Sequence, residues 1–510
     1  MGGESEHGMD GAGEKLSYAE ELWSHCNRLR PKMEAAEYKH VILRIYSLFA
    51  LSDLQKTQSK RVQMPAGTLW KDIKGKVDEF AGEGGKNGEL EAAKHIDEAM
   101  IQVAEANSEI TGCFPPVFER LMVNNETIQE LMERFSETLQ NQDPGTIYQF
   151  FLRKFAEIEG RGGGEFFTPE SILDVMVRVL NFTSGTIYEP CFGAGSMIAK
   201  THKHSMEATS SKKQVLKFYA QEANPTNYHI GKVHMFILGI EVDFALGDTL
   251  LEDAFEPHAT GAIANPPFNL KEWTNNTVLL VDKQKDGNGK VIEIPKDDRW
   301  KAWGPPPKAN ANFAWMQHID YHCNSKTKRW GVVFSKGTLS NSSSSKNRQI
   351  MTESDSVLCV LSLPTQLFTN TPIPSVIWFG GTKPKHRKGE TLFINCHEVG
   401  RLLSRTLREL EEGEIEKIAN TFAAWVGEGG CDLQYEDEVG YCRSVSINEI
   451  RDHNFVMSPG RFVGVPSIID TDEALTNLDQ IISKLSVNFV ETTRLENEVK
   501  KGLKELGYDV

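Results

Sequence analysis

The residues from Asn265 to Phe268 have types and an order that can bind a flat ring carrying an amino group. The apolar run 261–264 ends at Asn265, and the proline pair that follows cannot continue a central strand, so the backbone leaves the sheet there. The side-chain carbonyl of Asn265 and the backbone carbonyl of Pro266 are then two fixed acceptors for an exocyclic amino group, and Phe268 can stack on the ring. Taken alone, these residues also fit a strand end with a rigid turn.

Three upstream segments that read as strands end in residues suited to a nucleoside-like ligand. Gly193 and Gly195 let the backbone approach a ligand, and the helix they open supplies free N–H groups and a positive dipole end. Glu222 is placed to bind ribose hydroxyls, and Asp248 can accept a hydrogen bond from an adenine amino group. The third glycine of a dinucleotide fingerprint is missing, and the absence of Gly-Lys-Ser/Thr excludes a nucleoside triphosphate P-loop.

The elements that must position these residues alternate between strand and helix. Helices are predicted from Ser171 to Leu180, from Ser196 onward, from Asn224 to about Leu238, and from Ala311 to Cys323. This alternation predicts right-handed crossovers and a mostly parallel sheet, which places the strand ends at one edge. Strands are predicted at 186–189, 217–221, 242–245, 261–264, 330–335, 357–363, 376–380 and 392–395.

Composition shifts divide the chain into five regions. The stretch before the Gly-rich joint at 160–164 has apolar residues at helical spacing and few strand signals. Residues 270–308 form a long connection with three tryptophans, which predicts a functional lid or binding element. The predicted regions are a disordered tail (1–14), an N-terminal α-helical domain (15–159), a catalytic domain (160–400), a linker and accessory region (401–466) and C-terminal helices for subunit assembly (467–510).

The net charge of -15 argues against a chain that binds nucleic acid with its whole surface. Contact with DNA or RNA therefore requires a local basic surface or a partner. The eight cysteines include no Cys-x-x-Cys pair, which argues against a zinc site and against a disulfide framework. No apolar run approaches the ~20 residues of a membrane helix, and the glycine-rich acidic N-terminus has no signal-peptide core, so we expect a cytoplasmic protein.

The order of these motifs resembles the S-adenosylmethionine-dependent methyltransferases of the N6-adenine class. In particular, the chain is similar over nearly its whole length to the modification (M) subunits of type I restriction–modification systems. The string Gly-Glu-Phe-Phe-Thr-Pro and the helical N-terminal domain are specific to that family, whereas the glycine loop and Asn-Pro-Pro-Phe are shared more widely. The motifs that carry the resemblance are 164–169, 193–195, 221–225, 247–250, 363–374 and 22–41.

The resemblance implies an α/β, Rossmann-like methyltransferase core with an N-terminal α-helical domain and a C-terminal helical extension. It implies a site-specific DNA adenine N6-methyltransferase that uses S-adenosylmethionine and no metal. The catalytic residues would be Asn265, Pro266, Pro267 and Phe268, which bind an adenine flipped out of the duplex. The cofactor-binding residues would be Glu165, Phe166, Phe167, Thr168, Pro169, Glu170, Glu189, Pro190, Gly193, Ala194, Gly195, Glu222, Asn224 and Asp248.

The same resemblance implies an assembly. A specificity (S) subunit would read the DNA sequence, and a second M subunit, the same or different, and a restriction (R) subunit would join it. DNA would then be bound mainly through the complex, in agreement with the acidic composition. One departure concerns the first strand end, where Glu189 stands in place of the family's usual aspartate and reaches one methylene further.

Two other readings fit part of the pattern. Methyltransferases that modify a protein glutamine or a ribosomal RNA guanine use the same pair of acceptors, but their chains are usually shorter and lack both helical arms. A non-catalytic scaffold with the methyltransferase fold would have Glu189 as its only support. The nature of the methyl acceptor separates the first of these readings from DNA methylation, and retention of the cofactor separates the second.

Overall fold

A computed structural model describes most of the chain in two compact units, Met1–Val463 and Gly464–Val510. The expected tail at 1–14 lies outside the described residues, as do residues 160–167, which include Glu165, Phe166 and Phe167 of the predicted cofactor motif. In the second unit, Ile482, Leu485 and Phe489 are more than half exposed. The described residues are 19–24, 26–27, 35–82, 90–139, 142–159, 168–209, 215–274, 281–285, 291–368, 374–428, 433–465 and scattered positions between 482 and 504.

The described residues before Thr168 that lie in regular elements are helical, in agreement with the prediction for this stretch. Their amphipathic faces close on an aromatic core in which Trp23 meets Phe155 edge-on, with ring centroids 5.0 Å apart. Such edge-to-face pairs add to the burial of their area. The helices after residues 19–27 are α2 (Ala35–Gln58), α3 (Trp70–Gly82), α4 (Glu91–Ala106), α5 (Asn125–Thr138) and α6 (Pro144–Glu159).

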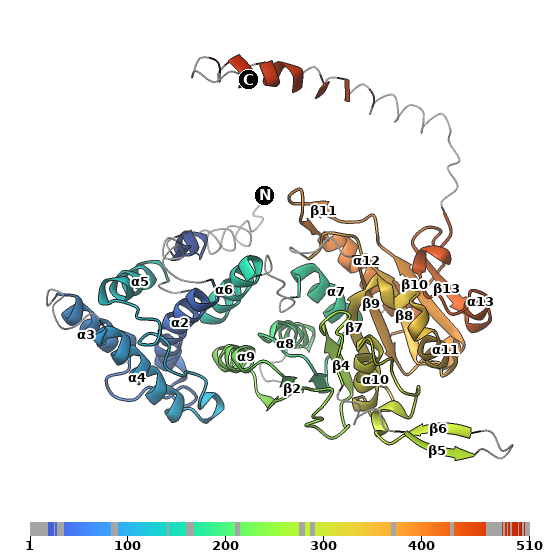
Figure 1. The fold of residues 1–510 in the computed structure, drawn as a ribbon, viewed down its shortest axis with the longest axis horizontal. Helices are drawn as coiled ribbons and strands as arrows, with labels where there is room; N and C mark the ends of the chain where they lie inside the picture. Colours follow the sequence, from blue (N-terminus) through green and yellow to red (C-terminus); the bar gives the residue numbers. More distant parts are fainter. Residues whose placement is uncertain are drawn as a thin grey trace, which may run out of the picture. The chain divides into compact units, whose positions relative to one another are not determined.

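The second half of this unit is built on a nine-stranded sheet with the order β13-β10-β8-β9-β7-β4-β1-β2-β3 (Figure 1). All of its strands run parallel except β9 and β13, which pair antiparallel with their neighbours. The predicted mostly parallel α/β sheet is therefore confirmed. The strands are β1 (Gly185–Glu189), β2 (Leu216–Glu222), β3 (Val242–Leu246), β4 (Gly261–Ala264), β7 (Arg329–Ser335), β8 (Val357–Ser362), β9 (Ser375–Gly381), β10 (Glu390–Asn395) and β13 (Cys442–Ser446).

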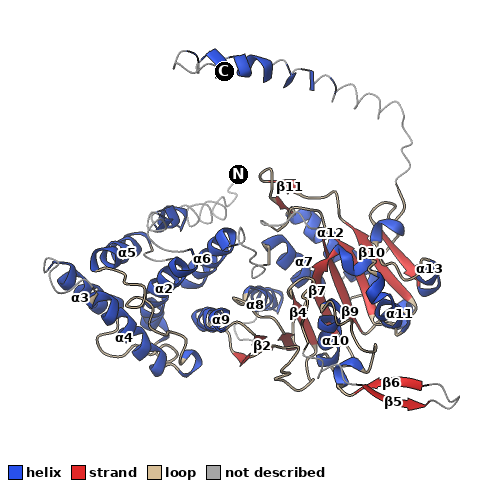
Figure 2. Cartoon of the chain, viewed as in Figure 1, coloured by secondary structure: helices blue, strands red, loops and turns tan. Residues whose placement is uncertain are grey.

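Helices cover both faces of the sheet, so its central strands are continuous apolar runs (Figure 2). Alternate residues of a strand enter the two cores: Val333 of β7 lies in one, while Val332 and Phe334 lie in the other. The first core includes residues of α7 (Glu170–Leu180), α8 (Ser196–Thr209) and α12 (Glu412–Val426). The second includes residues of α10 (Asn312–His322), α11 (Ser345–Glu353) and α13 (Ile447–Asp452).

Helix α9 (Pro225–Leu238) belongs to both the helical region and the sheet. Its residues Val233, Phe236 and Ile237 complete the core of the N-terminal helices, while Met235 enters a core of the sheet. Arg61 also donates a hydrogen bond to the backbone oxygen of Phe236. The N-terminal helices therefore have their own core, but they share one wall of it with the region that follows.

Two expectations differ from the structure. Residues 401–466 are not a linker, because β13 completes one edge of the sheet and α12 packs on α7. The long connection 270–308 holds an antiparallel hairpin, β5 (Val281–Lys285) and β6 (Val291–Pro295). Its three tryptophans, Trp273, Trp300 and Trp303, are at most 3% exposed and belong to the core, so they are not available to read DNA.

A substitution at Gly380, which packs against Trp330 of the neighbouring strand, tests the packing of the sheet. A Cβ at Gly380 would overlap the Trp330 ring, which is fully buried and paired with Gly380 across β7 and β9. We expect Gly380→Ala to lower the free energy of unfolding by about 1–3 kcal/mol in urea titrations. Gly413→Ala is the matched control, because Gly413 lies in α12 and a Cβ at this position would have no atom within 4 Å. It should leave stability unchanged or raise it by up to about 1 kcal/mol; equal losses in both variants would contradict the packing.

Candidate cofactor and target-base site

The carboxyl ends of β1, β2, β3 and β4 border one cavity, at the point where the strand order reverses between β1 and β4. Its volume is about 850 Å³ when the open mouth and the solvent there are included. The four strand ends singled out in the sequence are thus brought together. The cavity is lined by Thr168, Glu189, Pro190, Cys191, Phe192, Gly193, Ala194, Ser196, Met197, Glu222, Ala223, Asp248, Thr249, Asn265, Pro267, Leu270 and Trp315.

The Asn265 side chain is held with its carbonyl oxygen free. Its Nδ2 donates a hydrogen bond of 3.0 Å to Oγ1 of Thr168, a buried residue two positions before the start of α7. Oδ1 of Asn265 is buried and has no partner among the described residues. A buried acceptor without a donor is costly, so the site is prepared for a ligand that brings an N–H group.

The loop after β4 is fastened behind the proline pair by Asn269, whose φ of 54° is left-handed. Its backbone N–H donates to Oδ1 of Asn312 at 3.0 Å, and Nδ2 of Asn312 donates back to Oδ1 of Asn269 at 3.0 Å. Nδ2 of Asn269 also donates to Oγ of Ser335 at the end of β7. This cluster ties β4, β7 and α10 together and fixes the turn that carries Asn265 and Pro266.

Glu189 is the most strongly perturbed acid of the cavity. It is 2% exposed, and its Oε2 has no partner among the described residues. Burial raises the pKa of this carboxyl well above its usual value, and the nearby Glu222 raises it further, against the opposing backbone N–H of Ile198. Burial thus favours the protonated form of this carboxyl, and a cationic ligand would favour the ionised form.

Glu222 holds the glycine loop through hydrogen bonds to its backbone. Its two oxygens accept from the backbone N–H groups of Gly193, at 2.7 Å, and Asn224, at 2.8 Å. Burial raises the pKa of Glu222, while these N–H groups lower it. At Gly195, with φ of 82°, a Cβ would collide with the Phe192 ring. That glycine makes room for a side chain of the loop, a different reason from the close approach of a ligand.

Several predicted residues lie beside the cavity without lining it. Glu170 pairs with Lys200, and the Asn224 side chain caps α9 by accepting from Thr226 and Asn227. The Phe268 ring meets Phe368 edge-on, with centroids 5.7 Å apart. Pro169, Gly195 and Pro266 are also absent from the lining, and Glu165, Phe166 and Phe167 lie outside the described residues.

Other lining residues were not predicted from the sequence. Trp315, on α10, is 5% exposed, and its indole N–H has no partner among the described residues. Together with Oδ1 of Asn265 and the Glu189 carboxyl, it gives the cavity three buried polar groups without a partner among the described residues. Trp315 and Leu270 follow the four-strand motif in the chain, and only the tertiary contact between α10 and the loop after β4 brings them here.

Arg299 supports the cavity from the 270–308 connection. It is 5% exposed and donates to the backbone oxygens of Thr249, at 3.1 Å, and Leu250, at 3.0 Å, in the loop after β3. Asp297 holds the guanidinium at 2.6 Å. The connection thus buttresses the segment that carries Asp248.

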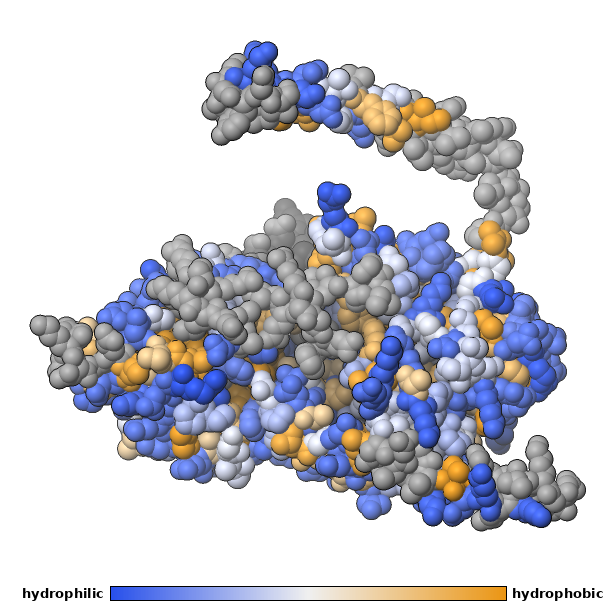
Figure 3. Space-filling view, in the orientation of Figure 1, coloured by the Kyte–Doolittle hydropathy of each residue, from blue (hydrophilic) through white to orange (hydrophobic). Residues whose placement is uncertain are grey.

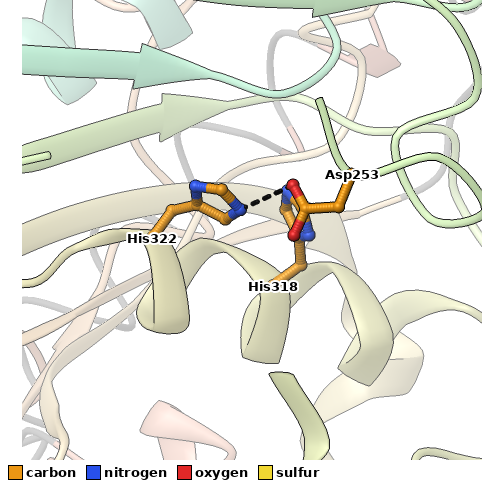
Figure 4. A group of neighbouring side chains, drawn as sticks. All are labelled: Asp253, His318 and His322. Carbon is orange, nitrogen blue, oxygen red and sulfur yellow. Dashed lines mark hydrogen bonds and ion pairs between the residues drawn. The ribbon is translucent and has the colours of Figure 1, made fainter. Parts of the chain in front are cut away.

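Next to Arg299, the side chains of Asp253, His318 and His322 converge closely enough for a metal ion (Figure 4). Both ring nitrogens of His318 are engaged, with Tyr188 at 2.9 Å and with Arg299 at 3.3 Å. A guanidinium at this distance opposes a second positive charge. We therefore assign the cluster to the hydrogen-bond network that joins the loop after β3 to α10.

Comparisons with known proteins agree with this architecture. Residues 140–471 match the N-6 DNA methylase family. The chain is 34% identical to the HindI type I restriction enzyme methylase subunit of Haemophilus influenzae, over 82% of this chain and 93% of that protein. It is 29% identical to the MjaIX methylase subunit of Methanocaldococcus jannaschii, over 96% of this chain and 92% of that protein.

Among solved structures, the type I restriction–modification methyltransferase subunit from Streptococcus thermophilus superposes with a TM-score of 0.69 at 18% identity, covering 88% of this chain and 99% of that one. This likeness confirms the predicted fold class. In the described residues, no helix is long and apolar enough to span a membrane. The predicted enzyme class, DNA adenine methyltransferase, is confirmed by the family match and by the two relatives. The chain therefore belongs to the N-6 DNA methylase family, alongside the methylase subunits of type I restriction–modification systems.

Proposed function

We propose that the cavity binds S-adenosylmethionine and that the chain transfers its methyl group to N6 of an adenine in DNA. The observation that carries the proposal is the free, buried Oδ1 of Asn265 at the end of β4. The hydrogen bond from Nδ2 to Thr168 holds this side chain in place. An adenine amino group supplies the N–H that this acceptor lacks. Because the acceptor is fixed before the substrate arrives, its orientation need not be established during the reaction.

The residues of the cavity fit this cofactor in kind. Its free, buried Glu189 carboxyl suits a cation, and Glu222 and Asp248 stand at strand ends that suit a ribose and an adenine. The Gly193–Gly195 loop opens α8, whose N-terminus suits a negative group. When bound, S-adenosylmethionine supplies an electrophilic methyl group on a sulfonium centre. We assign the predicted cofactor-binding residues 165–170 to the methionine end of the cofactor as part of this proposal.

The protein's own contribution is to position the target amine. Oδ1 of Asn265 and the backbone oxygen of Pro266 accept its two hydrogens, which draws the nitrogen lone pair out of conjugation with the ring. Phe268 provides a face for stacking once its contact with Phe368 opens. The Asn269–Asn312–Ser335 cluster keeps these groups aligned, because a shift of the turn would break several of its hydrogen bonds. Positioning and electrostatics thus supply the rate.

We also propose that the chain works in an assembly with a specificity subunit, a second modification subunit and a restriction subunit. The named relatives are subunits of type I restriction enzymes. The C-terminal unit exposes Ile482, Leu485 and Phe489, and hydrophobic side chains are visible on its surface (Figure 3). Their spacing suits docking on another helix. The net charge of -15 agrees with sequence recognition by a partner.

The first prediction concerns Asn265. We expect Asn265→Ala to lower the turnover of DNA methylation by about a hundredfold or more, because the amino group loses an acceptor that is fixed in advance. S-adenosylmethionine affinity, measured by calorimetry, should remain nearly unchanged. Transfer of a tritiated methyl group to DNA, RNA and protein by the assembled complex measures both turnover and acceptor class. Substantial methylation by the variant would contradict the assigned role, and preference for RNA or protein would replace DNA as the substrate.

The second prediction concerns Thr168, which orients the Asn265 amide. Thr168→Val keeps the shape and removes the acceptor for Nδ2, so the amide is free to turn. We expect turnover to fall about tenfold, the effect of one net hydrogen bond of roughly 1–1.5 kcal/mol. Thr168→Ser keeps the hydroxyl and should stay close to the unaltered protein. An equal loss in both variants, or a loss only in cofactor affinity, would remove this role.

The third prediction follows from the raised pKa of Glu189. In the free protein burial favours the protonated carboxyl, and a bound cation favours its ionised form. Binding of S-adenosylmethionine should therefore release a proton, and affinity should increase by up to about tenfold per pH unit until the free carboxyl ionises. Calorimetry in buffers of different ionisation enthalpy measures the proton. Glu189→Gln should flatten the pH dependence; an unchanged dependence would assign the proton elsewhere.

A further inference from the structure

A short hairpin stands on the sheet edge that carries the cavity. Strands β11 (Arg401–Leu402) and β12 (Arg408–Glu409) pair antiparallel (Figure 1). Residues 401–406, which are β11 and most of its connection to β12, are here called the β11–β12 tip. The tip is ordered by its own hydrogen bonds. Leu403 and Ser404 donate to the backbone oxygen of Leu407 at 2.9 and 3.2 Å, and Oγ of Ser404 accepts from the N–H of Leu407 at 3.1 Å.

Register relations place the hairpin on the same edge as Asn265. It follows β10, which is parallel to β8, and the final residues of β8 pair with the start of β9, as the final residues of β7 do. These ends therefore lie in line with the end of β4, which is parallel to β7.

A chain of contacts links the tip to the target-base residues. Phe268 meets Phe368 in the loop after β8. Two residues earlier, the side chain of Gln366 donates from Nε2 to the backbone oxygen of Arg405 at 2.8 Å. The backbone oxygen of Gln366 accepts from the backbone N–H of Arg408, also at 2.8 Å. The tip is thus held by the loop that touches Phe268.

The composition of the tip differs from that of the chain as a whole. It carries two arginines and two hydroxyl residues but no acid, within a protein of net charge -15. Arg405 forms no ion pair with a described residue, and the one ion pair of Arg401 is to Glu411 at 3.9 Å, between side chains that are 67% and 63% exposed. Such a pair is worth little.

Between these arginines lie two exposed leucines. Leu402 is 54% exposed and Leu403 is 49% exposed. A single exposed leucine on a surface is ordinary, but adjacent leucines on an ordered, basic projection are a surface with a defined chemistry. A duplex offers a match in which phosphates meet the cations and base faces meet the apolar groups.

We propose that the β11–β12 tip binds the DNA duplex at the target adenine, with Arg401 and Arg405 on the phosphates and Leu402 and Leu403 against the bases that lose their stacking partner when the adenine leaves. This inference rests on the proposed function. Flipping a base costs a few kcal/mol of pairing and stacking, and apolar side chains that cover the exposed neighbours lower that cost. The tip therefore favours the flipped state.

The test compares two duplexes in the assembled complex. The target sequence is first obtained by sequencing the methylated DNA of a host that expresses the complex. Leu402→Ala combined with Leu403→Ala should slow methylation of the matched duplex about tenfold or more. A duplex with a mismatched base opposite the target adenine flips more easily and should restore the rate to within about threefold of the unaltered complex. Val215→Ala is the control, because Val215 is an exposed aliphatic residue directly before β2, on the opposite edge.

The arginines have a separate readout. Arg401→Gln combined with Arg405→Gln should weaken duplex binding and reduce the slope of log affinity against log salt by about two, one for each phosphate. Lys385→Gln combined with Lys388→Gln is the control, because these exposed lysines follow β9 on the opposite edge. S-adenosylmethionine affinity should be unchanged in all four proteins.

Unchanged methylation by the leucine variant, or equal losses on both duplexes, would overturn the proposal. Failure of that variant to assemble with the specificity subunit would also overturn it, because the tip would then be a protein contact. An unchanged salt slope in the arginine variant would remove the phosphate contacts and likewise count against it. If the unaltered complex methylates no DNA, the proposed function fails first, so the two failures are distinguishable.

Discussion

The hydrogen bond from Nδ2 of Asn265 to Thr168 is the interaction on which the site depends. An asparagine amide presents a donor and an acceptor of nearly the same shape, and rotation by half a turn exchanges them. Because Thr168 accepts from Nδ2, Oδ1 is the group that remains free in the cavity. The proline pair adds a constraint from the backbone, since it ends β4 and leaves the oxygen of Pro266 outside the sheet ladder.

The surrounding structure serves to hold these two acceptors still. The Asn269 cluster fixes the turn from one side, and Glu222 fixes the glycine loop from the other. Arg299 extends this support to the loop after β3. Each of these contacts joins segments that are distant in the chain, and the sheet edge is what brings them within reach. A parallel sheet with its carboxyl ends in register therefore acts as the frame of the site.

Much of this frame could be predicted from the sequence, because buried parallel strands are short apolar runs bounded by glycine, proline or acids. The eight predicted strands all appear; seven have limits shifted by at most one residue, and β10 begins two residues earlier than predicted, at Glu390. Strand β13, Cys-Arg-Ser-Val-Ser, was missed because an edge strand needs few apolar residues. The polar helix α11 was missed for the same reason: its signal is weak where only a few of its positions are buried.

The residues of the site likewise divide into those that could be predicted from the sequence and those that could not. Residues next to a strand end, such as Glu189, Glu222 and Asn265, carry a local signal, and they line the cavity. Trp315 and Arg299 carry none, because their roles arise only when α10 and the 270–308 connection fold against the loops. The tryptophans of that connection also show how composition misleads, since an aromatic residue fits a binding surface and a core equally well.

Helix α9 has a consequence for communication within the protein. His234 on this helix is fully buried, bonds through Nδ1 to the backbone oxygen of Ala194 at 2.7 Å, and stacks on Tyr148 of α6 with centroids 5.4 Å apart. Burial lowers the pKa of His234 to about 4, so the ring stays neutral and the contact persists across the physiological pH range. The N-terminal helices thus touch the glycine loop through one imidazole. If a displacement of Tyr148 moved Ala194, it would change the free energy of ligand binding in the cavity, and by reciprocity ligand binding would act on the helices to the same extent.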